Sequence, residues 1–271
     1  MNITDTKILK ALLERHGLTP TKKFGQHFLV SQPVVDKIIL AALADPVPAS
    51  ILEVGPGPGV LTRPLSEAVS NLVAYEVDEI AVSALTESAP LAEIRGIDFL
   101  SVDLYEEMSA WSRDVAIVSN MPYNITGPLL TSFTRLRPLV SRAVLMMQLE
   151  VGQKILSKPG DRAMGSISVF LQSRWDISKV CDAPSGAFFP PPKVQSIVLQ
   201  FVPKPEFHNE PKHESVVRQG FSQPRKTLVN NLRGTYPMIS EVLIAMKIDV
   251  QIRPHQLSLD QWFSLVKQLT A

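Results

Sequence analysis

The chain has 271 residues, of which 45% are hydrophobic, and its formal net charge is +1, so it is long enough for one domain of ordinary size plus a smaller one. No apolar run approaches the ~18 residues of a membrane span, and the single cysteine, Cys181, excludes an intrachain disulfide and fits a reducing compartment. The five histidines are scattered, so no metal site is predicted, and the lack of an apolar signal core near the N-terminus predicts a cytoplasmic protein.

Two amphipathic helices are predicted at the start of the chain. Residues 4–16 have helical spacing of apolar side chains, and Gly17 is a stop signal. Residues 34–43 predict a second helix, with Ser31 as its N-cap.

A glycine-rich loop follows the second helix. A short apolar strand at 51–54 runs into Gly55-Pro56-Gly57-Pro58-Gly59, where the glycines allow a tight turn and a close approach of backbone to a ligand. A second apolar strand at 72–75 ends in Glu76, roughly 20 residues after the first glycine, which is the spacing of an acid that binds ribose hydroxyls. Such a glycine pattern alone is often only a loop, but strand, loop, helix, strand and acid in this order indicate a nucleoside-binding site.

Two aspartates compete for one further role. A strand predicted at 92–97 is followed by Asp98, whose carboxylate can accept a hydrogen bond from an adenine amino group. Asp103 lies five residues further on and is a candidate for the same role. The alternative for Asp98 is a helix N-cap.

The most informative stretch of the chain follows the apolar run 115–118, which predicts a buried strand of a parallel sheet. Asn120-Met121-Pro122-Tyr123 would lie just beyond the carboxyl end of that strand, where open α/β sheets bind their ligands. The Asn120 amide oxygen and a backbone carbonyl can accept both N–H bonds of an exocyclic amino group, while the Tyr123 ring stacks against the base. The alternative is a type I turn with proline at its second position.

The order of the elements predicts the architecture. Strand–helix alternation from residue 51 to about 157 calls for a parallel sheet with helices on both faces. Pro203-Lys204-Pro205 breaks this pattern, and the remainder shows only helical spacing, so the domain boundary is predicted near residue 203. Further strands are predicted at 144–147, from 175 and over 194–202, and a further helix over 167–172.

These stretches together resemble a known family. Glu53-Val54-Gly55-Pro56-Gly57-Pro58-Gly59, Glu76, Asp98 and Asn120-Met121-Pro122-Tyr123-Asn124-Ile125 are similar to motifs of S-adenosylmethionine-dependent N6-adenine methyltransferases. Three further segments resemble the small-subunit (16S) ribosomal RNA adenine N6-dimethyltransferase family: Lys23-Phe24-Gly25-Gln26-His27-Phe28-Leu29, Phe188-Phe189-Pro190-Pro191-Pro192-Lys193-Val194 and Phe221-Ser222-Gln223-Pro224-Arg225-Lys226-Thr227. The resemblance runs from about residue 22 to the C-terminus.

The resemblance implies a fold and an activity. The fold is α/β, with a Rossmann-like class I methyltransferase sheet of seven mostly parallel strands and a small all-helical C-terminal domain. The methyltransferase domain would cover 1–203, with an N-terminal helical extension over 1–30, and the helical domain 204–271. The activity is S-adenosylmethionine-dependent N6-dimethylation of two adjacent adenosines in a hairpin loop near the 3′ end of small-subunit ribosomal RNA, coupled to small-subunit biogenesis. The expected partners are this RNA and the immature small subunit, and the expected state is a monomer.

The resemblance also assigns roles to residues. Catalytic roles fall to Asn120, Met121, Tyr123 and Phe188, with Phe189 packed below Phe188. Cofactor binding falls to His27, Leu29, Gly55, Glu76, Asp98 and Asn120. Three residues depart from the family's usual pattern: His27 where asparagine is more frequent, Met121 where leucine is common, and Pro224 where a basic residue is usual. The last departure weakens one expected phosphate contact.

The charge distribution indicates where RNA would bind. The segment up to residue 27 and the segment from residue 204 each carry a net charge of +3, whereas the middle is acidic by about 5. Arg225 and Lys226 are predicted to open a helix, with Arg233 about two turns on and on roughly the same side. Cations at that spacing suit phosphate contacts. The alternatives are a solvated helix face and an RNA surface on the N-terminal basic segment, 7–23.

Two other functions fit parts of the sequence. One is a resistance-type methyltransferase of large-subunit RNA or a DNA N6-adenine enzyme, against which the segment 221–227 and the long helical C-terminal region argue. The other is a non-catalytic RNA-binding assembly factor, against which the intact Glu76, Asp98, Asn120 and Tyr123 argue.

Overall fold

The computed structural model describes residues 1–21, 25–109, 111, 114–123, 126–205 and 212–270. Residues 22–24 and 124–125, which belong to two of the motifs above, lie outside this part of the chain. The chain forms two compact units. Unit 1 comprises Met1–Gly152 and Ile177–Pro203, and unit 2 comprises Gln153–Asp176 and Lys204–Ala271.

These units differ from the predicted division at residue 203 in one segment. Residues 153–176 include α8 (Ser166–Arg174), whose Val169 and Phe170 pack into the same core as Val216 and Trp262 of the C-terminal region. This shared core groups the segment with unit 2 although it precedes the last strands in sequence. The domain limits 1–203 and 204–271 stay a prediction.

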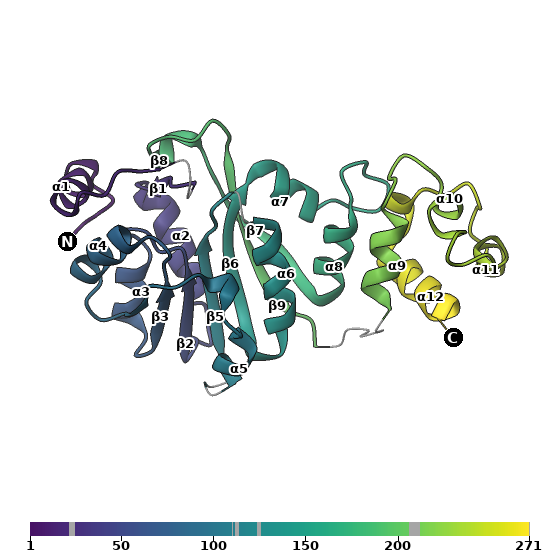
Figure 1. The fold of residues 1–271 in the computed structure, drawn as a ribbon, viewed down its shortest axis with the longest axis horizontal. Coiled ribbons are helices and arrows are strands. Elements are labelled where there is room, and N and C mark those ends of the chain that lie inside the picture. Colours follow the sequence, from purple (N-terminus) through teal and green to yellow (C-terminus); the bar gives the residue numbers. More distant parts are fainter. Residues whose placement is uncertain (22–24, 110, 112–113, 124–125, 206–211, 271) are drawn as a thin grey trace. The chain divides into compact units, whose positions relative to one another are not determined.

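Unit 1 is built around a seven-stranded sheet of order β4-β3-β2-β5-β6-β9-β7 (Figure 1). Strands β4, β3, β2, β5 and β6 run parallel to one another, and β9 runs antiparallel to β6. The predicted sheet of seven mostly parallel strands is therefore confirmed. Its strands are β2 (Ser50–Val54), β3 (Leu72–Tyr75), β4 (Glu93–Arg95), β5 (Val115–Asn120), β6 (Val140–Gln148), β7 (Trp175–Ala183) and β9 (Ser196–Pro203).

Helices cover both faces of this sheet, which explains why the central strands β2 and β5 are buried along almost their whole length. On one face, Ala116 and Val118 share a core with α2 (Gln32–Ala42), α3 (Thr62–Ala68) and α4 (Glu79–Ser88). On the other face, Tyr75 meets Phe99 edge to face at 5.8 Å between ring centroids. Phe99 in turn meets Phe133 at 6.0 Å. Phe133 belongs to α6 (Thr126–Leu136), which packs beside α5 (Leu104–Ser109).

The N-terminal segment of unit 1 contains helix α1 and the short strand β1. Helix α1 (Thr6–His16) is capped at both ends. The Asp5 side chain accepts a hydrogen bond from the Lys7 N–H, and Gly17 follows the helix with a φ of 68°, a left-handed conformation that glycine adopts freely. Further on, β1 (Phe28–Leu29) pairs antiparallel with β8 (Phe188–Phe189). This two-stranded sheet ties the N-terminal segment to the connection between β7 and β9.

From Lys204 on, the described residues form only helices, as predicted. These are α9 (His213–Gly220), α10 (Leu228–Leu232), α11 (Ile239–Ala245), η4 (Pro254–Gln256) and α12 (Leu259–Thr270). Trp262 is fully buried and stacks on Phe221 at 5.5 Å between ring centroids. A Cβ on Gly220 would lie 2.5 Å from Trp262 Cη2, so the close approach of α9 to this ring requires glycine. The remaining short elements of the chain are α7 (Leu149–Ile155), η1 (Phe99–Ser101), η2 (Arg137–Leu139) and η3 (Ser185–Ala187).

The helix predicted to open at Arg225 begins later, so that prediction is wrong. Thr227 has extended backbone, and its side chain caps α10 by accepting from the Asn230 N–H at 3.3 Å. Arg225 and Lys226 therefore lie in the turn before the helix, whereas Arg233 lies at its C-cap.

Membrane spans and metal clusters are both absent from the described residues. None of the described helices has the length and apolarity that crossing a bilayer requires. No group of three or more His, Cys, Asp or Glu side chains in that part of the chain could hold a metal ion.

Candidate active site

A cavity of about 310 Å³ opens where β2, β3 and β5 end, a volume at the lower end of the range for small-ligand sites. The parallel register sets Val54 beside Tyr75 and Glu53 beside Val118, so the residues that follow these strands meet at one edge of the sheet. Eight residues that the sequence assigned to the site line this cavity: His27, Leu29, Gly55, Glu76, Asp98, Asn120, Met121 and Tyr123.

The glycine loop after β2 has a backbone that only glycine adopts without strain. Gly55, Gly57 and Gly59 have φ values of 66°, 56° and 91°. A Cβ on Gly57 would lie 3.1 Å from Phe28 Cε1, and a Cβ on Gly59 would lie 2.5 Å from Ser88 Oγ. The loop backbone therefore lies close against Phe28 and Ser88, and a side chain at Gly57 or Gly59 would crowd these contacts.

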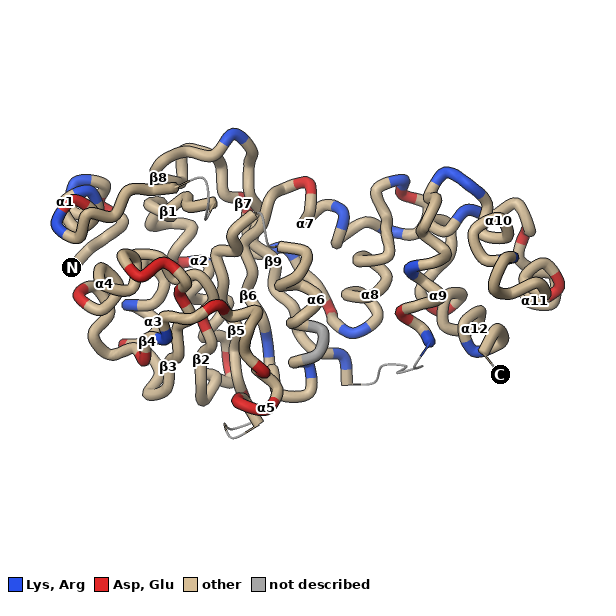
Figure 2. The backbone as a smooth tube through the Cα atoms, viewed as in Figure 1, with Lys and Arg blue, Asp and Glu red and all other residues tan. Residues whose placement is uncertain are grey.

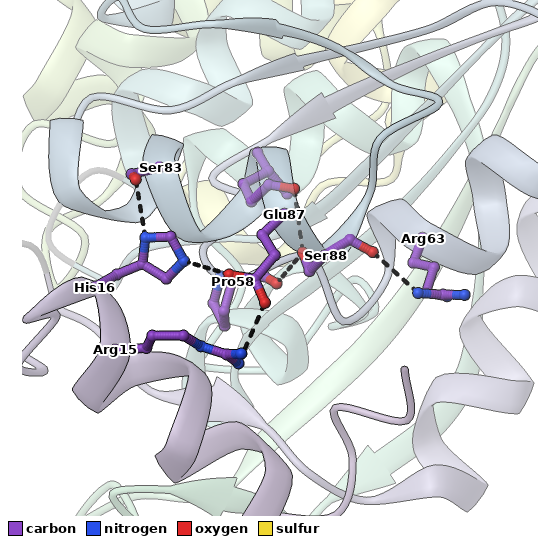
Figure 3. Close-up of polar contacts among 8 residues, drawn as sticks. Arg15, His16, Pro58, Arg63, Ser83, Glu87 and Ser88 are labelled. Carbon is purple, nitrogen blue, oxygen red and sulfur yellow. Dashed lines mark hydrogen bonds and ion pairs between the residues drawn. The ribbon is translucent and has the colours of Figure 1, made fainter.

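Helix α4 supports this loop from outside the cavity (Figure 3). The Ser88 hydroxyl donates to the Pro58 carbonyl at 2.7 Å. One residue earlier the Glu87 carboxylate pairs with Arg15 at 3.2 Å and with the His16 imidazole at 2.7 Å. Helix α1 is thus docked on the helix that buttresses the glycine loop.

Glu76 fastens the glycine loop to the end of β3. One carboxylate oxygen accepts the Gly57 N–H and the other accepts the Asp78 N–H, each at 3.0 Å. Burial raises the pKa of Glu76, and the backbone hydrogen bonds oppose this rise. Each oxygen keeps a further lone pair for a ligand hydroxyl. The sequence predicted a ribose ligand here but not this second task of holding the loop.

Glu53 is a second buried acid in the cavity wall, and its role was not predicted. Its side chain is 1% exposed, and its Oε2 atom has no hydrogen-bond partner among the described residues. Burial raises the pKa of Glu53 to about 8, and the nearby Glu76 carboxylate adds to the rise. At neutral pH the carboxyl group is therefore protonated.

The two candidate adenine ligands lie in different places. Asp98 lines the cavity and caps η1 by accepting the Leu100 N–H at 2.9 Å, so the alternative role as an N-cap is present as well. Asp103 is not among the residues that line the cavity, and it accepts the Glu106 N–H at 3.2 Å. The geometry favours Asp98, whose contact with adenine stays a prediction.

Asn120 is oriented by the N-terminal segment. Its amide nitrogen donates to the His27 carbonyl at 3.1 Å, and within the described part of the chain no group donates to its amide oxygen. The Met121 N–H donates to the Met146 carbonyl at 3.0 Å and so fixes the backbone after β5. This arrangement can accept hydrogen bonds from an amino group, as the sequence predicted.

Tyr123 is contacted by His27 at its ring and by Ser196 at its hydroxyl. It stacks against the His27 imidazole, with 5.8 Å between ring centroids and 27° between the planes. The imidazole is held in turn because its Nδ1–H donates to the Pro190 carbonyl at 2.8 Å. The Tyr123 hydroxyl lies 2.6 Å from Ser196 Oγ. Neither this hydrogen bond nor the histidine stack was predicted, because the partners lie far apart in sequence.

The two phenylalanines of β8 differ in burial. Phe188 is only 3% exposed and packs in the core, whereas Phe189 is partly exposed and has the Lys10 ammonium 5.0 Å from its ring centroid. Phe189 still packs against the same core, opposite Phe28 of β1. The placing of Phe189 below Phe188, and base stacking by Phe188, which is not a lining residue, stay predictions.

The three residues predicted to bind RNA belong to unit 2. Arg225, Lys226 and Arg233 are exposed, and none forms an ion pair with another described residue. The turn that carries Arg225 and Lys226 lies beside Ile252, whose carbonyl accepts the Leu228 N–H at 2.8 Å.

Known proteins similar to this chain agree with the geometry. The family model described as "Ribosomal RNA adenine dimethylase" matches residues 17–271. A protein named "Ribosomal RNA small subunit methyltransferase A" from Synechococcus elongatus is 38% identical, over 92% of this chain and 94% of its own length. One of the same name from Nitrosomonas europaea is 36% identical, over 93% of this chain and 97% of its own length.

Solved structures show the same fold. A dimethyladenosine transferase from Plasmodium falciparum has a TM-score of 0.76 and 24% identity, over 89% of this chain and 97% of that one. The 23S rRNA methyltransferase ErmE has a TM-score of 0.70 and 23% identity, over 90% of this chain and 100% of that one.

The cavity acids allow a prediction about pH. The pKa of Glu53 is raised to about 8 in the folded state, so the folded chain holds this proton at pH values where the unfolded chain has lost it. The neutral carboxyl group makes its full contribution to the free energy of unfolding below about pH 4.5. This contribution falls as pH rises toward 8, by up to roughly 1.4 kcal/mol per pH unit. Glu53→Gln should remove this decline, as measured by urea unfolding between about pH 5 and pH 8. Glu79→Gln, at an exposed position, is the control, and parallel profiles for Glu53→Gln and wild type would contradict the prediction.

A second prediction concerns the cofactor. Glu76→Ala should weaken S-adenosylmethionine binding by about 1.5–3 kcal/mol, the range for hydrogen bonds to a charged group. It should also lower stability, because two backbone N–H groups lose their acceptor. Calorimetry measures the affinity, and the exposed Glu79→Ala should bind like wild type. Unchanged affinity in a folded Glu76→Ala protein would remove Glu76 from the site.

Proposed function

Because the chain belongs to the ribosomal RNA adenine dimethylase family, we propose that it dimethylates N6 of two adjacent adenosines in a hairpin loop near the 3′ end of small-subunit ribosomal RNA. The chain is an S-adenosylmethionine-dependent ribosomal RNA adenine dimethyltransferase. The names of its relatives support small-subunit RNA over the alternatives, large-subunit RNA and DNA. In this proposal it acts as a monomer in the cytoplasm on the immature small subunit, as a step of subunit biogenesis.

The cavity residues fit the cofactor. The glycine loop lines the cavity with backbone that a ligand can approach closely, and Glu76 offers lone pairs to ribose hydroxyls. In this assignment Gly55 lines the methionine part, Asp98 accepts from the adenine amino group, and the segment 27–29 covers the ligand. Bound S-adenosylmethionine supplies a methyl group on a sulfonium, an electrophile for a nitrogen lone pair.

The orientation of Asn120 carries the mechanism. Adenine N6 is a poor nucleophile because its lone pair is delocalised into the ring. The Asn120 amide oxygen, left free because the amide nitrogen donates to His27, accepts one N6 hydrogen and the Met121 carbonyl accepts the other. These two bonds favour a pyramidal nitrogen whose lone pair points at the methyl group. Orientation of the two reactants supplies most of the lowering of the barrier.

The position of the cavity at the sheet edge favours an adenosine in a loop over one in a duplex. An adenosine inside a duplex must leave its stack to reach a pocket at a sheet edge, at a cost of a few kcal/mol. A loop adenosine costs less, which supports a hairpin loop as the target. The Tyr123 ring then offers a stacking surface of about 1–3 kcal/mol per base.

The turn before α10 is the proposed RNA surface (Figure 2). Arg225 and Lys226 lie there next to Ile252, and Arg253 follows that residue. Burial lowers the pKa of His255, and the charges of Arg253 and Arg162 lower it further, so the local field is positive. A cluster of exposed cations of this kind suits phosphate contacts better than base contacts.

The direct test of the proposed function is methyl transfer from labelled S-adenosylmethionine to small-subunit particles that lack the modification, with the modified nucleotides mapped. Two adjacent N6-dimethylated adenosines in one loop are expected. Transfer to large-subunit RNA or to DNA instead would support the alternative methyltransferases, and binding without transfer would support an assembly factor.

Removal of the Asn120 amide should separate binding from chemistry. Asn120→Ala should keep the cofactor affinity within a few-fold and lower the methylation rate by roughly 10²–10³, the scale for losing one partner that stabilises a transition state. Asn71→Ala is the matched control, because Asn71 bonds Ser50 at the opposite end of β2. Single-turnover kinetics measure the rate, and near-normal turnover of Asn120→Ala would refute the mechanism.

The RNA surface can be tested by its salt dependence. Replacement of Arg225, Lys226 and Arg233 with alanine should weaken binding to the small-subunit particle. It should also lower the salt slope, which is the steepness with which the logarithm of the binding constant falls against the logarithm of the salt concentration, by about 0.7–0.9 for each phosphate group that is no longer neutralised. Cofactor binding should not change, because every residue that lines the cavity belongs to unit 1.

The control for the RNA surface replaces Lys212, Lys247 and Lys267 of the same unit, which removes equal charge. Equal affinity and salt slope for the test variant and wild type would leave the N-terminal basic segment as the RNA surface.

A further inference from the structure

The Tyr123 ring is held at its tip as well as on one face. The hydroxyl at the tip lies 2.6 Å from Ser196 Oγ. The face contact is the His27 imidazole, which is itself fixed by the Pro190 carbonyl. A base that stacks on the opposite face of the ring avoids this imidazole.

Ser196 is an unusual residue for its place in the sheet. It is the first residue of β9, it pairs with Gln148 of β6, and it is fully buried. The next residues of the strand, Ile197 to Leu199, are apolar and buried. A hydroxyl in such surroundings is costly unless it is hydrogen-bonded. Its hydrogen-bond partner among the described residues is the Tyr123 hydroxyl, whereas alanine would serve packing alone.

We propose that Ser196 is a positioning residue for the methylated base, which acts through the Tyr123 hydroxyl. The inference rests on the proposed function, because it requires an adenine that stacks on Tyr123. A tyrosine ring without an anchor at its tip moves about χ1, so the base that stacks on it is less well placed for reaction. The hydrogen bond fixes χ1 before RNA arrives, and the ring becomes a stationary platform. Burial raises the pKa of the Tyr123 hydroxyl although the Ser196 bond opposes this, so the anchor does not depend on ionisation near neutral pH.

The test is a double-mutant cycle of Ser196→Ala and Tyr123→Phe, which remove the two halves of one hydrogen bond. Each single variant should lower the rate of methyl transfer at saturating RNA by roughly three- to ten-fold, the range of one neutral hydrogen bond. The double variant should be no slower than either single variant. S-adenosylmethionine affinity should be unchanged. The control is Ser173→Ala, a buried serine of unit 2 whose hydroxyl bonds the Phe170 carbonyl, and it should react like wild type.

A readout that does not need methyl transfer separates this inference from the proposed function. Target-loop RNA with 2-aminopurine in place of the methylated adenine should lose fluorescence when the base stacks in wild-type protein, and lose less with Ser196→Ala. If wild type transfers no methyl group to small-subunit RNA, the proposed function fails, and the fluorescence alone decides the inference. Two fluorescence results would overturn the inference: equal quenching by Ser196→Ala and wild type, or no quenching by wild type. It would also be overturned if Ser196→Ala still lowered the rate in the Tyr123→Phe background.

Discussion

Three parallel strands end at the same edge of the sheet, and the site depends on this constraint. The register that sets Val54 beside Tyr75 and Glu53 beside Val118 brings Gly55, Glu76 and the residues after β5 to one cavity, although they are far apart in sequence. The carboxylate of Glu76 then joins two of the strand ends by accepting the Gly57 N–H. A shift of β2 by one residue would turn its side chains to the other face and separate these groups.

The N-terminal segment supplies the remaining wall, and its contacts reach each of the three strand ends. Gln26 donates to Asp78 after β3 at 2.7 Å, the His27 carbonyl accepts from Asn120 after β5, and Phe28 lies against Gly57 after β2. This segment therefore does more than cover a ligand, because it sets the orientation of the Asn120 amide. The chemistry of the site and the docking of the N-terminal segment are physically linked through that one hydrogen bond.

The sequence predicted the sheet, the helical C-terminal region and eight of the cavity residues. Six of the eight follow from local order, an apolar strand and the residues after it, whereas His27 and Leu29 came from the family resemblance. The sequence did not predict contacts made by pairing across the fold. The contact of Lys10 with the Phe189 ring joins segments far apart in the chain, and the anchor of Tyr123 follows from where β9 begins. The start of α10 depends on the extended backbone of Thr227 and on its side-chain cap, which the spacing of the basic residues does not report. The raised pKa of Glu53 depends on complete burial of its side chain, which an apolar pattern alone does not report.

The proposed mechanism requires the Asn120 amide oxygen to accept a hydrogen bond from the target adenine while the amide nitrogen donates to the His27 carbonyl. A structure of the protein with S-adenosylhomocysteine and the small-subunit hairpin RNA measures this contact directly. The mechanism predicts an unstacked adenine on the face of Tyr123 opposite His27, with N6 about 2.7–3.2 Å from both Asn120 Oδ1 and the Met121 carbonyl oxygen. An adenine bound elsewhere, or N6 beyond hydrogen-bond distance of Asn120 Oδ1, would contradict it.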